Sequence, residues 1–191
     1  MAASILIGRL GPMQTAGHLV AINFSALLFM IPLGLASSVT TRVGNALGRQ
    51  DPLGARHAGL VGLGIVLCTQ TISASIMVFA PGLVVSIYTA DAGIAAVAVG
   101  LLFYAAIFQL SDGLQICSAG ILRGYKDTLI PMWINVLSYW VVGLTLGYYL
   151  TFTRELGPAG MWIGMIAGLT FGAVLLTSRF LRVSARHIRR S

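Results

Sequence analysis

Asp112 is the residue of this sequence best placed to do chemistry, because it is the only charged residue in the apolar run 93–122. A carboxyl group at that depth in a membrane costs roughly 3 kcal/mol or more unless it is paired, hydrated or protonated. Helical spacing puts Gln109, Gln115 and Phe108 about one turn from it, which predicts a shared polar face. Such a face predicts a cation-binding site in which the carboxyl group holds a proton or exchanges it for Na⁺. The alternative is a structural carboxyl group hydrogen-bonded to a neighbouring helix.

Three further residues are candidates for a hinge or a substrate pocket. Pro32 removes a backbone hydrogen bond inside an apolar run, which predicts either a hinge or a static kink. Asn23 and Tyr139 are polar groups at membrane depth, where they either face a pocket or hydrogen-bond neighbouring helices. Gln70 and Asn135 are similarly expected to bridge helices.

Glycines recur at every fourth position of the last apolar segment, at 160, 164, 168 and 172. On a helix this spacing forms a smooth stripe along one side. A stripe of small residues lets another backbone approach closely, so it predicts a tight contact between two helices.

The composition of the chain is that of a membrane protein. Of its 191 residues, 57% are hydrophobic and only 9% are charged, against about a quarter charged in soluble domains. Five apolar segments exceed the roughly 20 residues that a transmembrane helix needs. Because backbone groups must be paired in hydrocarbon, the predicted fold is all-α: a polytopic transmembrane bundle of about five full spans plus a partial first helix. The five segments are residues 14–41, 58–88, 93–122, 128–150 and 157–178.

The basic residues are distributed unevenly between the two sides of this predicted bundle. If the loop 42–57 is cytoplasmic, every Lys and Arg except Arg9 and Arg154 lies on that side. This asymmetry predicts a multi-pass protein of the cell (inner) membrane, with the N-terminus outside and residues 183–191 as a basic cytoplasmic tail.

The net charge of +7 lies at the ends of apolar segments rather than on a polar face, which argues against nucleic-acid binding. Neither metal-ligand spacing nor a phosphate loop is present, so no metal or other cofactor is expected.

Two long stretches resemble the multidrug and toxic compound extrusion (MATE) family in its NorM-type members. One is HLVAINFSALLFMIPLGLASSVTTRVGNALGRQD, which is similar to the family's eighth helix and the following cytoplasmic loop. The other is LLFYAAIFQLSDGLQICSAGILRGYKDT, which is similar to the tenth helix and its loop. The resemblance implies two six-helix lobes, with residues 1–182 as a partial C-lobe made of the end of helix 7 and helices 8 to 12.

The resemblance also implies a function, which is transport rather than catalysis. It implies secondary active multidrug efflux, in which an organic cation leaves the cell while Na⁺ or H⁺ enters, and it places Asp112 in the C-lobe cation site. Phe108 stands where the family often has a tyrosine, so a hydroxyl ligand is absent there. The implied partners are membrane lipids, organic cation drugs and the missing N-terminal lobe or another chain. Two alternatives remain: a truncated, non-transporting remnant, or a lipid-linked precursor flippase of a related fold.

Overall fold

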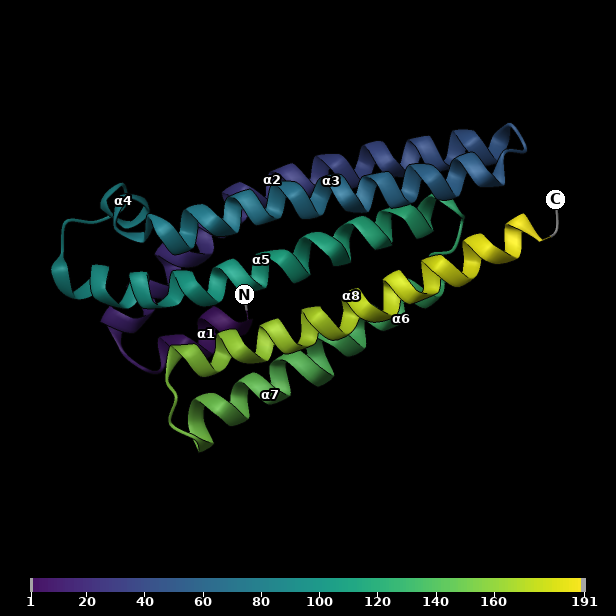
Figure 1. Cartoon of the computed structure of the whole chain (residues 1–191). Helices are drawn as coiled ribbons and strands as arrows, with labels where there is room; N and C mark the ends of the chain where they lie inside the picture. The colour runs from purple at the N-terminus through teal and green to yellow at the C-terminus, as the bar shows by residue number, and fades with distance from the viewer. Residues whose placement is uncertain (1, 190–191) are drawn as a thin grey trace.

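The computed structural model describes residues 2–189, which form long helices joined by short turns (Figure 1). The continuous helical segment Leu129–Thr153 alternates between α and π geometry. The elements in chain order are α1 (Ala2–Gly8), α2 (Pro12–Gly48), α3 (Pro52–Phe79), α4 (Pro81–Ser86), α5 (Ala92–Gly124), α6 (Leu129–Val136), the π-helix η1 (Leu137–Leu144), α7 (Thr145–Tyr148), the π-helix η2 (Tyr149–Thr153) and α8 (Pro158–Ile188).

Within residues 2–189, five segments are long and apolar enough to cross a membrane, which confirms the predicted all-α polytopic bundle. They are Pro12–Gly48, Pro52–Phe79, Ala92–Gly124, Leu129–Thr153 and Pro158–Ile188. The last helix continues through most of the predicted basic tail, while residues 190 and 191 of that tail lie outside the described part of the chain.

The predicted segment 58–88 is wrong as a single helix. Helix α3 ends at Phe79 and α4 starts at Pro81, with Ala80 between them at φ −130° and ψ 43°. Proline has no N–H to donate, and its ring disfavours helical geometry in the residue before it. The chain therefore turns at Ala80 before it enters α5.

Local sequence signals fix where the helices begin. Proline is the first residue of α2, α3, α4 and α8, a position where its missing N–H costs nothing. Asp51 caps α3, because its Oδ1 accepts a hydrogen bond of 2.7 Å from the Gly54 N–H. Asp91 caps α5 in the same way, through the N–H groups of Gly93 and Ile94.

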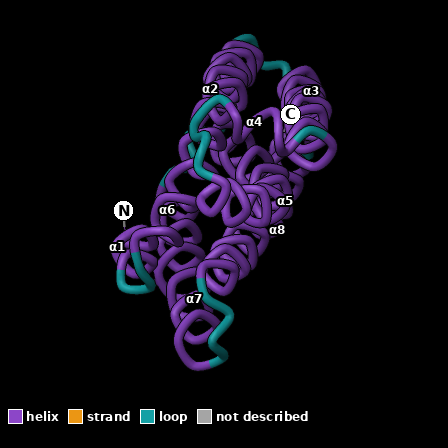
Figure 2. The backbone as a smooth tube through the Cα atoms, turned by 90° about the vertical axis from the view of Figure 1, so that its left-hand side faces the viewer, coloured by secondary structure: helices purple, strands orange, loops and turns teal. Residues whose placement is uncertain are grey.

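Helix α5 is the centre of the bundle. It packs against α2, α3 and α8, and the end-on view in Figure 2 shows it between the α2–α3 pair and α8. Helices α5 and α8 run parallel, because Ser111 pairs with Thr170 and Ser118 pairs with Thr177, each at 2.8 Å between hydroxyl oxygens. A residue at the middle of α5 is therefore enclosed by several different helices.

The glycine stripe of α8 packs against the segment Leu129–Thr153. A methyl group added at Gly164 would overlap the backbone of Gly147, and one at Gly168 would come within 2.8 Å of the Gly143 Cα. Only glycine allows the two backbones to lie this close, so the predicted tight contact is confirmed.

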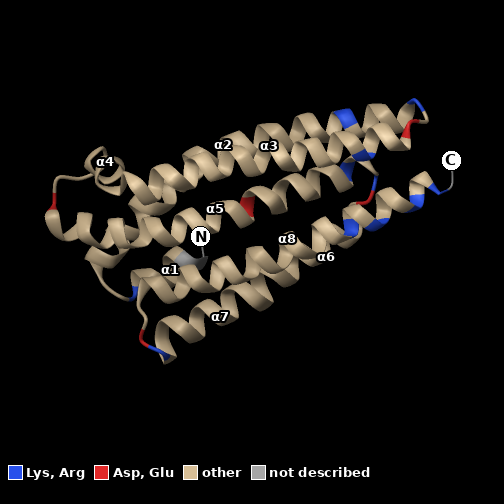
Figure 3. Ribbon diagram, in the orientation of Figure 1, with Lys and Arg blue, Asp and Glu red and all other residues tan. Residues whose placement is uncertain are grey.

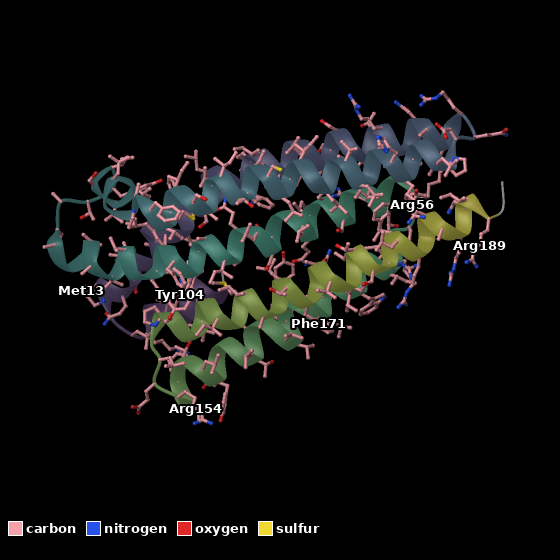
Figure 4. The ribbon with its side chains drawn as sticks, in the orientation of Figure 1. Met13, Arg56, Tyr104, Arg154, Phe171 and Arg189 are labelled. Carbon is pink, nitrogen blue, oxygen red and sulfur yellow. The ribbon has the colours of Figure 1, made fainter. Side chains whose placement is uncertain are left out.

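Charged residues gather at the two ends of the bundle, and Lys and Arg gather mainly at the end that carries the α2–α3 turn (Figure 3). Arg56 and Arg189 lie at this basic end, whereas Arg154 lies at the opposite end (Figure 4). Between the two ends the exposed surface is mainly apolar, and Asp112 is the one acid within the apolar part of α5.

Candidate functional site

Asp112 lies about two thirds of the way along α5 and is half-buried. Its carboxylate lines a small cavity of about 60 Å³ between α5, α2 and the segment α6–η1. Within residues 2–189 it has neither an ion-pair partner nor a hydrogen bond. A charge at this depth is therefore not compensated by any described side chain. The lining residues are Phe29, Asp112, Gln115, Ile116, Ala119, Asn135 and Tyr139.

The other polar groups of this cavity are amides and a phenol. The Nε2 of Gln115 donates a hydrogen bond of 2.8 Å to Oδ1 of Asn135, while the Gln115 Oε1 is buried without a hydrogen-bond partner. Tyr139 is 49% exposed and belongs to η1, so a π-helix presents its phenol to the cavity. The cavity thus combines a carboxylate with neutral oxygen atoms, which are the ligands that hard cations prefer.

The structure does not bring Gln109 to this cavity. Gln115 and Gln109 are six residues apart, so at about 100° per residue they point about 120° apart around α5. Gln109 is buried against α3 instead, where its backbone carbonyl accepts a hydrogen bond of 2.9 Å from Nε2 of Gln70. This bond joins α3 to α5, as expected for a polar group at membrane depth.

Phe108 is also absent from the residues that line the cavity. Its ring packs edge-on against Trp162 of α8, with ring centroids 5.5 Å apart. Trp162 in turn packs edge-on against His18 of α2, at 5.7 Å. The aromatic side chain one turn before Asp112 therefore belongs to a packing cluster that joins three helices.

Of the hinge and pocket candidates, Tyr139 lies at the cavity, whereas Pro32 and Asn23 do not line it. Helix α2 is continuous through Pro32, which is buried. Phe29, which sequence reasoning missed, lies three residues before Pro32 and contributes to the cavity wall. No spacing within α2 relates Phe29 to Asp112, so no local sequence signal could have identified it. Asn23 is exposed on α2 and has no hydrogen bond within the described residues.

The size of the cavity limits what it can hold. About 60 Å³ accommodates a cation with a few water molecules. Pockets for drug-sized ligands have roughly 300–1,000 Å³. A drug-sized ligand would therefore not fit in this cavity.

Comparison with known proteins identifies the chain's relatives. The MatE family model matches residues 1–149. The chain is 51% identical to the "Probable multidrug resistance protein NorM" of Xanthomonas campestris pv. campestris over 183 residues, which is 96% of this chain and 40% of that protein. It is 42% identical to the "Multidrug resistance protein PmpM" of Pseudomonas aeruginosa over 190 residues, again 40% of that protein. The chain thus spans about 40% of the length of these curated relatives.

Solved structures share the fold. A eukaryotic MATE transporter, AtDTX14, superposes with a TM-score of 0.84 at 21% identity, over 93% of this chain and 41% of that one. An outward-facing multidrug resistance MATE family transporter superposes with a TM-score of 0.85 at 22% identity, over 96% of this chain and 41% of that one. Because the family model covers most of the chain and these folds agree with it, the chain belongs to the MatE family of membrane multidrug transporters, which are not enzymes.

Proposed function

We propose that this chain forms most of the C-lobe of a secondary active transporter that expels organic cations in exchange for Na⁺ or H⁺. The observation that supports this most is the uncompensated carboxyl group of Asp112 in a small, oxygen-lined cavity at membrane depth. A membrane protein retains such a group at a cost of several kcal/mol, which is typical of ion pathways and coupling sites.

In this proposal the coupling ion neutralises Asp112. A proton would bind to one carboxylate oxygen, and Na⁺ would bind to the carboxylate together with Oε1 of Gln115 and the phenol of Tyr139. Asn135 would position Gln115 through the hydrogen bond between their amides. An ion that enters down a membrane potential of 100 mV supplies about 2.3 kcal/mol per charge, which drives export without ATP.

Neutralisation would be coupled to movement through α2. Phe29 forms part of the cavity wall, and Pro32 lies less than one helical turn further along the same helix. Proline leaves a backbone carbonyl of the preceding turn without its usual partner, which makes bending easier at this position. A bend at Pro32 would therefore change the space next to Asp112 and the exposed face of α2 that carries Asn23.

The substrate pocket would lie between this lobe and a second one, because the Asp112 cavity is too small for a drug. The required partner is the remainder of a transporter of the relatives' length, as part of the same protein or as another chain. The basic end of the bundle would face the cytoplasm and Arg154 the outside, in accordance with the positive-inside rule. The organic cation, the coupling ion and this orientation are all parts of the proposal.

The test is the variant Asp112→Asn in a protein that joins this chain to the N-terminal part of a NorM relative. In proteoliposomes, efflux of an organic cation should no longer respond to an imposed Na⁺ or proton gradient, because Asn keeps the shape and removes the charge. Asp51→Asn is the matched control, since Asp51 is exposed at a turn and Asn also caps helices. We expect the control to transport normally.

Efflux is normalised to folded protein in both variants. A structural role for Asp112 predicts lower stability with intact coupling per folded molecule, and that result would remove Asp112 from the mechanism. The 191-residue chain alone should extrude no substrate, because the opposite wall of the pocket is not part of it. Gradient-dependent efflux by the purified chain would refute the two-lobe proposal.

A further inference from the structure

A second and larger cavity shares no lining residue with the Asp112 cavity. It is a groove of about 640 Å³ between α2 and α3, at the basic end where the two helices meet in a turn. Its lining residues recur at intervals of three and four along both helices, so one continuous face of each helix forms one wall. They are Leu35, Ser38, Val39, Arg42, Asn45, Ala46 and Arg49 of α2, with Gly54, His57, Ala58, Val61, Gly62 and Ile65 of α3.

The groove changes character along its length. Arg49 and His57 lie in the half near the turn, and Arg42 lies at the midpoint of the α2 wall. The half toward the middle of the bundle is formed by residues such as Leu35 and Ile65. At 1.5 Å per residue, the wall on α2 extends about 21 Å from its apolar end to its basic end. The groove therefore has a cationic mouth at one end of the membrane span and an apolar floor that runs into the span.

The positive charges at the mouth are not neutralised by the described part of the chain. Arg42 and Arg49 are exposed, and neither forms an ion pair within residues 2–189. None of the described residues that line the groove is acidic. Asp51 lies at the edge of the mouth, where its carboxylate caps α3 at Gly54, so this one acid stands against the two arginines and the mouth keeps a net positive charge.

We propose that this groove binds an anionic phospholipid, with its phosphate between Arg42 and Arg49 and an acyl chain along Val61 and Ile65. Guanidinium groups pair well with phosphate oxygens, and the apolar floor suits a hydrocarbon chain. Free phosphate would leave the apolar half without a partner, and a zwitterionic lipid would add no net negative charge at the mouth. The inference does not depend on antiport, because it requires only that the helix ends lie at the membrane surface.

The experiment measures which lipid stays bound to the purified 191-residue chain. The protein is transferred from detergent into vesicles of equal parts phosphatidylglycerol and phosphatidylethanolamine, re-extracted, and examined by native mass spectrometry. A basic side chain near an anionic headgroup contributes a preference of roughly five-fold. The double variant Arg42→Gln/Arg49→Gln should therefore lower the phosphatidylglycerol preference by up to about 30-fold.

Two controls separate this site from general charge attraction. Arg182→Gln/Arg186→Gln removes two exposed arginines from α8 at the same end of the bundle, outside the groove, and should leave the preference unchanged. Val61→Trp keeps the charges but fills the apolar floor, and should displace the lipid. Circular dichroism and gel filtration verify that each variant is folded.

Several results would overturn the proposal. The wild-type chain could show no preference for phosphatidylglycerol, or the α8 control could lose as much preference as the groove variant. Displacement by millimolar inorganic phosphate, with no effect of Val61→Trp, would make the groove a simple anion site. Loss of the bound lipid when the N-terminal part of a NorM relative is joined to the chain would show that protein covers the groove instead.

Discussion

The ion pair between Asp127 and Arg179 gives a prediction whose size follows from the structure. Asp127 lies in the turn after α5 and Arg179 lies near the end of α8. The guanidinium donates two hydrogen bonds to the two carboxylate oxygens, Nε to Oδ2 at 2.7 Å and Nη2 to Oδ1 at 3.0 Å. The pair thus holds the α5–α6 turn against α8 at the basic end of the bundle.

The expected energy lies between the values for exposed and buried pairs. Exposed pairs contribute about 0–1 kcal/mol, whereas breaking a buried pair costs about 3–5 kcal/mol. The side chains of Arg179 and Asp127 are 28% and 17% exposed, so both are partly desolvated. With two charge-assisted bonds in this environment, we expect a coupling energy of about 1–2 kcal/mol.

The two single variants should lower the free energy of unfolding by different amounts. Arg179→Gln leaves the carboxylate of Asp127, which is on a shorter and more buried side chain than the guanidinium, without its partner. We expect this to cost about 2 kcal/mol. Asp127→Asn leaves an arginine whose long side chain can turn toward water, so its cost should be nearer 1 kcal/mol. Arg182→Gln, three residues further along α8, is exposed and should change stability by less than about 0.5 kcal/mol.

A double-mutant cycle checks this reasoning. The free energy of unfolding is measured in mixed micelles for the wild type, Asp127→Asn, Arg179→Gln and the double variant. A coupling energy close to zero would show that the two groups contribute independently, and the ion pair would then have no role in holding α8. Equal losses of unfolding free energy in Arg179→Gln and Arg182→Gln would also refute a role for the ion pair in holding α8.

Three further predictions concern orientation, packing and the site. In a chain whose native cysteines are replaced by alanine, Arg154→Cys should react with an impermeant thiol reagent outside intact cells and Leu53→Cys should not; the reverse labelling would contradict the proposed orientation. Gly164→Ala should destabilise the bundle by about 1–3 kcal/mol, because the methyl group meets backbone. Gly64→Ala, where a methyl group meets nothing within 4 Å, should be neutral or stabilising in the same unfolding assay. Phe108→Tyr should leave the cation dependence of transport unchanged, since this ring does not line the cavity; stronger dependence would make position 108 a ligand.

The sequence by itself determined that the helices lie in a membrane rather than in water, how many of them are long enough to span it, and where the one acid lies within an apolar run. Composition and run length suffice for this, because a backbone in hydrocarbon has little choice but to form helices. The four-residue glycine period also identified the helix face that packs most closely, since only small side chains permit backbone contact. The break at Ala80 was missed although Pro81 signals it, because apolar character continues through the turn.

Tertiary structure decided which side chains meet. Spacing alone grouped Gln109 and Gln115 with Asp112, yet α5 is enclosed on several sides, and residues about 120° apart on it contact different helices. Asn135 and Phe29 reach the cavity from other segments, so no local pattern could have placed them beside Asp112. The groove near the turn exists only because one face of α2 lies alongside one face of α3, and the register between two helices depends on the packing of the whole bundle.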